Sequence, residues 1–491
     1  MGLVVLAYVA VLVVAVLIFQ FLVPSCEARA EDVLPRSVFP AAPVVDRLPN
    51  GLTLVTVDTG DVGVVAYFTL VRVGSRDEVE PGRSGYAHLF EHMMFRGTES
   101  RPGPEYERTM QGFGADHNAY TTNDYTLYTI TVPSSVLPDL VAVEAERFQH
   151  LAFDDEGYRA EVGAVLGEYA TTAADPTETM WQTLSALAFR RHPYGHTTLG
   201  HLADVCAMAS HVDYARAFFR RYYTPDDTTL VVVGDVRREA LLALVERHYG
   251  AWSGHRDRPA IPEEPEPTAG ARRDLAWPGP SEPALFVAYR TPSFAGPEEA
   301  SPEARRAALR ETVALEVVHA LAFSEASPLY ERLVERERVA LDLGSWDGDF
   351  TRDPALFVVA ATLSTPASAN RVIDAIDEEL AAVARGERDA LFADARSAVR
   401  YERLSSIRTV DDVAEQLART FAVSGSPGAF AELVAATDEV TVADVRRVAA
   451  RYLVRSRRFV VTLRGGAQEG GAVGEPDAPS ASMCDSIEAS P

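Results

Sequence analysis

The order of apolar and polar residues predicts a chain in which strands and helices alternate. Three β-rich stretches are expected to form strands, the first with a hairpin turn at Asn50-Gly51: residues 44–58, 62–73 and 118–132. Three stretches are expected to form helices: a segment that begins near Gly85, residues 137–153 and residues 158–171. This interleaving predicts a mixed fold of strands and helices.

An internal repeat predicts that the fold is duplicated. Residues 212–233 align without gaps with residues 442–463, and both stretches are typical of a helix followed by a β-branched strand. Units of this kind often resemble one another, so chance similarity is the alternative. We expect an α+β protein of two homologous α/β-sandwich halves of about 200 residues each, in which helices pack on an antiparallel-rich sheet.

Changes in composition mark the limits of these halves. Residues 255–274 are rich in proline and charge and predict a linker between a first domain, 36–254, and a second domain, 275–465. Residues 466–491 are rich in glycine, serine, proline and alanine, and we expect them to form a disordered tail.

The N-terminal segment, residues 1–30, is expected to direct the chain to a membrane. Residues 3–23 are apolar except for Gln20, long enough to cross a bilayer as an anchor. Cleavage after Ala30 of a signal peptide and lipidation of Cys26 are the alternatives. The arginines that follow the run slightly oppose export by the positive-inside rule, but the segment itself favours it. We therefore expect an exported chain, periplasmic or membrane-anchored.

Composition excludes several classes of function. The 491 residues include 71 acidic and 46 basic side chains, for a net charge of −25, so nucleic acid is not an expected partner. The three cysteines lack CxxC spacing, so we expect neither a disulfide framework nor a thiolate zinc cluster. Any metal ion is expected to bind histidines and carboxylates.

The motif HLFEH, residues 88–92, is the sharpest chemical signal. On a helix, His88 and His92 share one face, with Glu91 beside them. Two such imidazoles can bind zinc, and the carboxylate can accept a proton from water. The alternative is a helix with incidental histidines.

A second predicted helix offers a third ligand. Glu161 and Glu168 are seven residues apart and therefore share a face. Catalytic zinc uses three protein ligands and leaves one position open. Without the HLFEH motif, these residues would be ordinary solvated glutamates.

Together these motifs resemble the inverted zincins of the pitrilysin class, the relatives of insulin-degrading enzyme and the mitochondrial processing peptidase. That family has a third zinc ligand somewhat over seventy residues after HxxEH, and another functional glutamate seven positions before it. Glu168 follows His92 by 76 residues and Glu161 precedes Glu168 by seven. The stretches NAYTTNDYTLY from Asn118 and HPYGHTTLG from His192 also look like segments of the family.

The resemblance implies a zinc-dependent endopeptidase with one Zn²⁺ per chain. His88, His92 and Glu168 are the expected zinc ligands, and Glu91 is the expected general base for water. Glu161 is expected to orient a ligand histidine. A last set of residues is expected to hold an extended peptide by β-addition: Asn118, Ala119 and Thr121.

One departure implies a partner chain. Single-chain relatives supply an Arg/Tyr pair, spaced LRxxxxxxY, from their second half. Here Leu333 is followed by Val334, and the tyrosine position falls near Leu341. The chain thus resembles the zinc-bearing subunit of a pair, with a homologous partner that carries Arg and Tyr, or a homodimer. His319 is expected to be structural.

Two other classes of function stay open. A non-catalytic, membrane-anchored assembly or scaffold subunit of the same fold would lack hydrolytic activity. A soluble binding protein with accidental histidine spacing would bind no stoichiometric zinc.

Overall fold

The computed structural model describes residues 38–60, 63–296, 300–346, 350–466 and Cys484. The predicted N-terminal segment, 1–30, lies outside these residues, as does the predicted tail apart from Gly466 and Cys484. None of the described helices is long and apolar enough to cross a bilayer. The domain boundaries, residues 36–254 and 275–465, remain predictions.

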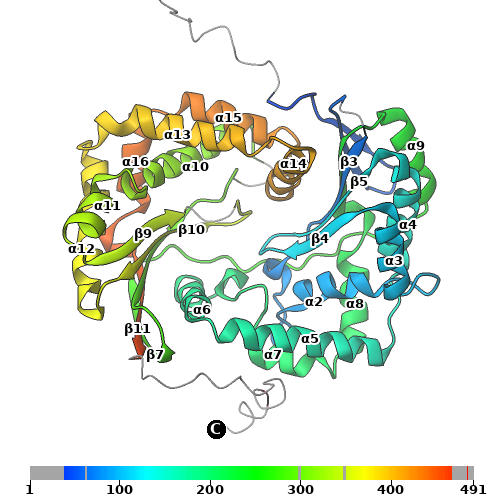
Figure 1. The fold of residues 1–491 in the computed structure, drawn as a ribbon, viewed down its shortest axis with the longest axis horizontal. Helices are drawn as coiled ribbons and strands as arrows, with labels where there is room; N and C mark the ends of the chain where they lie inside the picture. Colours follow the sequence, from blue (N-terminus) through cyan, green and yellow to red (C-terminus); the bar gives the residue numbers. More distant parts are fainter. Residues whose placement is uncertain (1–37, 61–62, 297–299, 347–349, 467–483, 485–491) are drawn as a thin grey trace, which may run out of the picture. The chain divides into compact units, whose positions relative to one another are not determined.

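The N-terminal half contains a mostly antiparallel sheet covered by helices (Figure 1). Its six strands, in spatial order, are β1 (Val44–Arg47), β2 (Thr53–Asp58), β6 (Thr228–Gly234), β3 (Val64–Val71), β5 (Thr126–Pro133) and β4 (Asp116–Thr121). Its helices are α2 (Tyr86–Met93), α3 (Gly103–Phe113), α4 (Leu137–His150), α5 (Asp155–Ala173), α6 (Pro176–Ala188), α7 (Leu202–Met208), α8 (Val212–Tyr222) and α9 (Arg238–Tyr249).

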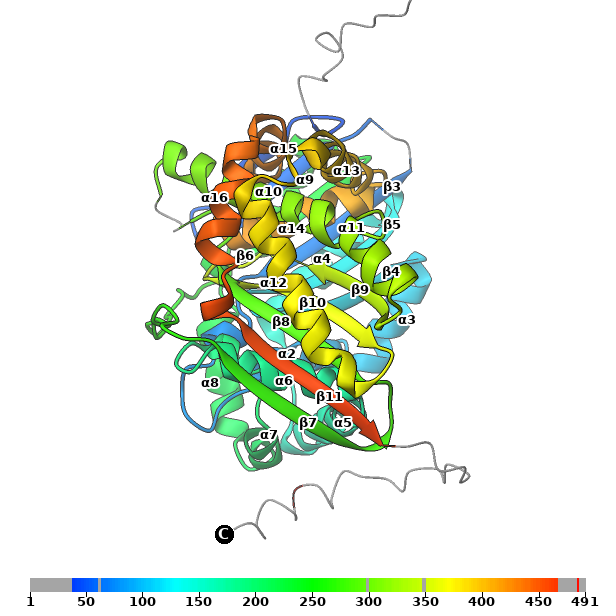
Figure 2. The ribbon, with the colours of Figure 1, turned by 90° about the vertical axis from the view of Figure 1, so that its left-hand side faces the viewer.

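The C-terminal half repeats this plan (Figure 2). Its five strands, in spatial order, are β7 (Ala271–Pro280), β11 (Phe459–Gly466), β8 (Ala284–Thr291), β10 (Ala355–Leu363) and β9 (Ala340–Trp346). Its helices are α10 (Pro302–Phe323), α11 (Pro328–Tyr330), α12 (Ala369–Arg385), α13 (Phe392–Ser405), α14 (Val410–Ser424), α15 (Ala429–Glu439) and α16 (Val442–Tyr452).

The topology of the two sheets confirms the predicted duplication. The order β2-β6-β3-β5-β4 in the first sheet corresponds to β7-β11-β8-β10-β9 in the second. In each sheet one parallel pair, β2 with β6 or β7 with β11, adjoins antiparallel pairs. The sequence repeat coincides with α8 and β6 in the first half, and with α16 and β11 in the second. The α+β class of two homologous halves is therefore confirmed.

Each half covers the other's sheet with one helix. Helix α14 packs on β3 and β6 of the first sheet, and α6 packs on β7, β8 and β11 of the second. The contact of α6 is apolar, because Met180 and Leu184 share a buried cluster with Phe286 and Val461 of the second sheet. The halves are thereby joined through their cores as well as through the linker.

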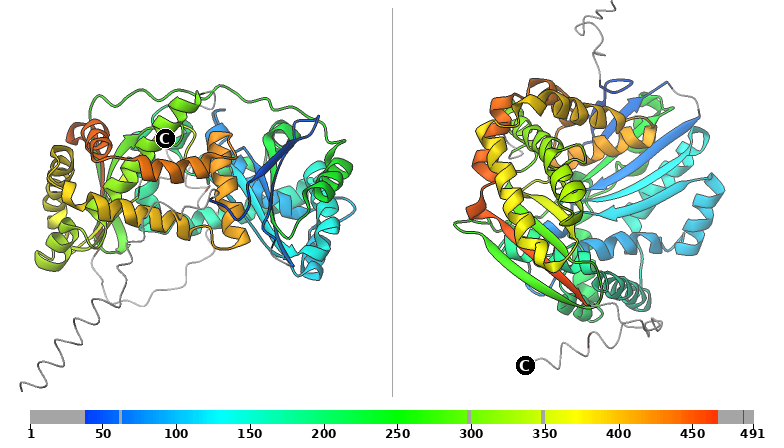
Figure 3. Two further views of the ribbon diagram at one scale, coloured as in Figure 1. Left: turned by 90° about the horizontal axis from the view of Figure 1, so that it is seen from above. Right: turned by 60° about the vertical axis from the view of Figure 1, so that its left-hand side comes forward.

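The linker crosses from α9 to β7 (Figure 3). Residues 252–267 form neither helix nor strand. Strand β7 begins at Ala271, before the predicted end of the linker at residue 274, because its first residues pair with β11.

The predicted strand over residues 118–132 is wrong in one respect, because it is two strands. The Thr122 hydroxyl accepts the backbone N–H groups of Asp124 and Tyr125, both at 3.1 Å. A threonine side chain that binds the backbone in this way stabilises a tight turn. The chain therefore reverses between β4 and β5, which pair antiparallel.

A disulfide joins Cys206 of α7 to Cys484. The cysteine spacing did not predict it, because the partners are 278 residues apart in sequence. A single disulfide is not a framework of several disulfides, so that expectation is not affected. Disulfides persist in oxidising compartments, so this bond is relevant to the location of the chain.

Candidate metal centre

Helix α2 carries the HxxEH motif and is held firmly at its start. Gly85, the residue before the helix, has φ +89°, a conformation that glycine adopts without strain. The carboxylate of Glu78 accepts the backbone N–H groups of Gly85 at 2.7 Å and Ala87 at 2.8 Å. These N–H groups have no partner within the helix, so Glu78 satisfies them. Burial raises the pKa of Glu78 to about 8.

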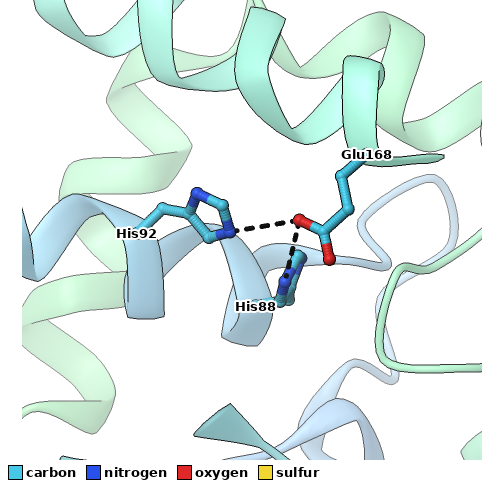
Figure 4. Close-up of side chains that lie close together, drawn as sticks. All are labelled: His88, His92 and Glu168. Carbon is cyan, nitrogen blue, oxygen red and sulfur yellow. Dashed lines mark ion pairs between the residues drawn. The ribbon is translucent and has the colours of Figure 1, made fainter. Parts of the chain in front are cut away.

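His88, His92 and Glu168 converge between α2 and α5 (Figure 4). The Nε2 atoms of His88 and His92 lie 3.6 and 3.4 Å from Oε2 of Glu168. In tetrahedral zinc with bonds of about 2.1 Å, ligand atoms stand roughly 3.4 Å apart. Both the donor set and the separations therefore fit zinc, and no other such group of three occurs among the residues that the structure describes.

The two imidazoles present unprotonated nitrogens to this point by different means. Burial, together with the nearby His92, lowers the pKa of His88 to about 4, so His88 is neutral near pH 7. Nδ1 of His92 lies 3.1 Å from Oε1 of Glu161, so its N–H donates a hydrogen bond to that carboxylate, and Nε2 faces Glu168. The hydrogen bond to Glu161 also raises the pKa of His92. Metal binding is therefore expected to weaken in acid.

Glu91 faces a cavity beside the three ligands. The cavity has a volume of about 490 Å³ and is lined by Glu91, His88 and Glu168, among others. Burial raises the pKa of Glu91, while the Thr121 hydroxyl, which donates to Oε2 at 2.6 Å, opposes this rise. A raised pKa makes this carboxylate a better proton acceptor.

The residues predicted to bind peptide lie on β4 and have different surroundings. Asn118 is exposed and its Oδ1 accepts the backbone N–H of Ala119 at 2.9 Å; neither residue lines the cavity. Thr121 does line the cavity, but its hydroxyl binds Glu91. Since β4 is an edge strand, its outer backbone groups are open to another strand.

A buried polar network joins the halves beside this cavity. The Tyr194 hydroxyl lies 2.8 Å from both carboxylate oxygens of Asp124, and the backbone N–H of Asp353 reaches the same hydroxyl at 3.3 Å. The Asp353 side chain accepts from Nε2 of His192 at 3.0 Å and from the Arg76 guanidinium. Burial opposes ionisation of Asp353, but these two donors outweigh it and hold the pKa of Asp353 well below its usual range.

At the positions where the resemblance implies an Arg/Tyr pair, the chain carries other residues. Leu333 is buried and Val334 follows it in the helical turn Glu331–Arg336. Leu341 lies on β9 and is 54% exposed. None of the three lines the cavity of the metal centre.

Sequence reasoning missed three residues that shape this site. Glu78 stands in no motif, although it precedes the N–H groups that it accepts by only seven and nine residues. Asp353 also stands in no motif and meets His192 across 161 residues. His196, which lines the cavity, stands in the HPYGHTTLG stretch, and that stretch was the only available signal.

Known proteins match this chain over both halves. Residues 57–201 match the family "Insulinase (Peptidase family M16)", and residues 212–399 match "Peptidase M16 inactive domain". An "uncharacterized zinc protease" of Mycobacterium leprae is 28% identical over 448 residues, 90% of this chain and 95% of the relative. The beta subunit of the mitochondrial-processing peptidase of Lentinula edodes is 24% identical over 445 residues, 83% of this chain and 87% of that one.

Solved structures share the fold. The crystal structure of a protease from Helicobacter pylori superposes with a TM-score of 0.77 at 24% identity, over 86% of this chain and 99% of that one. Matches to both domain types, in the order in which the two halves occur, agree with the duplicated topology. The chain therefore belongs to peptidase family M16, the insulinase and pitrilysin-like peptidases.

Proposed function

We propose that this chain is a zinc-dependent endopeptidase that hydrolyses extended peptides or small proteins. The observation that carries the proposal is the convergence of three ligand atoms from His88, His92 and Glu168. Two of these ligands, His88 and Glu168, line one cavity together with Glu91. The name of the Mycobacterium leprae relative, a zinc protease, agrees with it.

Each residue has one task in the proposed reaction. A zinc ion bound by His88, His92 and Glu168 would polarise the scissile carbonyl and make water more acidic. Glu91, which faces the cavity, takes the proton from the attacking water and delivers it to the leaving amine. Thr121 orients the Glu91 carboxylate by hydrogen bonding to Oε2.

Glu161 acts through His92 rather than on the substrate. It accepts the Nδ1 proton of His92 and so fixes the tautomer and the ring orientation. The Arg96 guanidinium, 3.5 Å away, helps to keep Glu161 ionised. Together with the His92 bond, which contributes most, it lowers the pKa of Glu161.

Main-chain pairing is the proposed mode of substrate binding. An extended peptide added to the edge of β4, along Asn118, Ala119 and Thr121, would run past Glu91. Such pairing reads backbone groups, so it tolerates many side-chain sequences.

A partner chain completes the proposal. The pattern LRxxxxxxY is not matched, because Val334 stands in place of its arginine and Leu341 in place of its tyrosine. This departure supports a homologous subunit that carries both residues, or a second copy of this chain. The relative from Lentinula edodes is itself named a subunit. Oxyanion donors contribute about 10²–10³ in rate, so a partner would raise activity strongly.

Export is the proposed location. The Cys206–Cys484 bond is of a kind that persists outside the cytosol, and the apolar stretch over residues 3–23 favours transport.

Substitution of Glu91 by glutamine tests the function. We expect Glu91→Gln to lower peptide hydrolysis by about 10²–10⁴-fold, because it removes the general base. Zinc content, measured by atomic emission on the purified full chain, should stay near one per chain, because Glu91 is not a ligand. Hydrolysis that survives unchanged in this variant would contradict the role of Glu91 as the general base. Absence of hydrolysis from the wild type, both alone and with its partner, would favour the non-catalytic scaffold subunit.

A further inference from the structure

The loop that contains residues 196–200 forms one wall of the cavity and is fixed against α2. Gly200 has φ +78°, and a Cβ on it would lie 2.6 Å from the backbone nitrogen of Gly85. A Cβ on Gly85 would in turn lie 2.7 Å from the carbonyl oxygen of Leu199. Backbone contacts this close leave the loop little freedom relative to His88. Its side chains therefore stand at a defined position beside the metal centre.

His196 on this loop has one nitrogen without a partner. The side chain is 8% exposed and lines the cavity together with His88, Glu91 and Glu168. Nδ1 lies 2.9 Å from the carbonyl oxygen of Thr197, so it carries a hydrogen and donates it. Burial lowers the pKa of His196 to about 4, so the ring is neutral and Nε2 has a lone pair. Within the described residues nothing donates to Nε2.

No role inside the chain accounts for this nitrogen. His196 does not belong to the group of three described residues that can hold a metal ion. Glu78 approaches Nδ1 rather than Nε2, at 4.0 Å, and already accepts two backbone N–H groups. The Thr197 hydroxyl, on the same wall, also lacks a partner among the described residues. Buried polar atoms nearly always have partners in native proteins, so a ligand that enters this cavity can supply the partners that these two atoms lack.

An extended peptide has the missing donors. A strand presents its N–H groups alternately to its two sides, so a peptide paired with β4 keeps every second N–H facing away from β4. Where the bound peptide packs against the cavity wall and excludes water, these N–H groups need acceptors. Nε2 of His196 is an acceptor on the wall of the same cavity.

We infer that His196 is a positioning residue for substrate: its Nε2 accepts a hydrogen bond from one backbone N–H of the bound peptide. The inference rests on the proposed peptidase function. It adds a specificity that β-pairing alone lacks, because proline has no N–H and is excluded from the substrate position that faces His196.

The test removes the N–H donor of the peptide and the His196 acceptor in separate experiments. The zinc-loaded full chain is assayed with an internally quenched decapeptide that it cleaves, and with variants in which one amide, other than the scissile one, is an ester. An ester lacks the N–H. At one position we expect KM to rise about five- to tenfold for the wild type with kcat nearly unchanged.

Variants of His196 remove or replace the acceptor, and each variant is assayed with both the parent peptide and the ester. For His196→Ala, we expect KM for the parent peptide to rise by the same factor and the ester at that position to have no further effect. His196→Gln places an acceptor near Nε2 and should restore both the low KM and the sensitivity to the ester. His201→Ala is the matched control, because its ring is exposed, lies 5.2 Å from that of His196 and should leave KM unchanged.

The outcomes separate the inference from the proposed function. The inference is overturned if KM for His196→Ala stays within about twofold of the wild type, or if the ester penalty persists in that variant. If His196→Ala does not fold, His196→Gln decides, because loss of the ester penalty there overturns the inference too. Loss of activity in Glu91→Gln supports the peptidase function in every one of these cases.

Discussion

The two halves of the molecule have the same topology but place different chemistry between equivalent helices. In the first half, α2 and α5 bring His88, His92 and Glu168 together. In the second half, the corresponding helices are α10 and α13, and a salt bridge between Glu316 and Arg403 joins them. In the second half, Arg403 thus supplies the positive charge that a metal ion would supply in the first half.

The second half also uses its histidine for structure. Nδ1 of His319 lies 2.6 Å from the Ser345 hydroxyl on β9, and burial lowers the pKa of His319. Its neighbours Glu316 and Glu402 line a separate cavity of about 450 Å³. The comparison teaches that the duplicated scaffold alone does not make the centre: three ligand side chains at the correct spacing do.

The largest effect is expected when the first half loses one of the three zinc ligands that distinguish it from the second half. Glu168→Gln takes away a carboxylate ligand, so we expect stoichiometric zinc to be lost and peptide hydrolysis to fall below detection. Glu402→Gln, on the corresponding helix α13, is the control and should leave zinc content and activity within about twofold. Equal loss of zinc in both variants would contradict the assignment of the centre to the first half.

The next largest effect is expected on the stability of the second half, when the Arg403 cation is removed. Arg403 is 7% exposed and also donates to the carbonyl oxygen of Leu433 at 3.3 Å. Arg403→Met leaves the partly buried Glu316 without its partner, so we expect the free energy of unfolding to fall by about 2 kcal/mol, measured by urea denaturation. Adding Glu316→Leu should recover most of this loss. Should the single variant be as stable as the wild type, the salt bridge has no structural role.

The smallest effect concerns the contact between the halves. Asp353 is held ionised by His192 and Arg76, with Asp124 nearby, so its folded pKa lies below the usual value of about 4. A lowered carboxyl pKa stabilises the fold above pH 4, and this contribution is lost as pH falls towards the folded pKa. We expect Asp353→Asn to cost about 2 kcal/mol at pH 7. Melting curves of the two proteins should converge as pH drops below 4; a constant gap would mean that the charge of Asp353 is irrelevant.

Local patterns were sufficient to predict the parts of this protein that depend on nearby residues. The four-residue spacing of His88 and His92 places them on one face of α2. The repeat of residues 212–233 at 442–463 predicted the duplicated halves, because it reflects equal helix and strand positions. Resemblance then supplied Glu168 as the third ligand.

Long-range contacts could not be predicted in the same way. Nothing near Asp353 indicates that it meets His192 and Arg76, since the three meet only when the halves pack. The orphaned nitrogen of His196 likewise depends on the fold of the whole loop against α2. The split of residues 118–132 into β4 and β5 depends on one Thr122 side chain that binds backbone, which alternation of apolar residues does not report.

The exchange of α6 and α14 has a consequence for the history of the chain. If the halves arose by duplication of an ancestral unit, that unit had to cover its own sheet or pair with a copy of itself. Today a fragment that ends at residue 254 would expose Met180 and Leu184 to water and leave β3 and β6 without α14. The two halves have thus become mutually dependent, and neither is expected to be inherited, expressed or lost without the other.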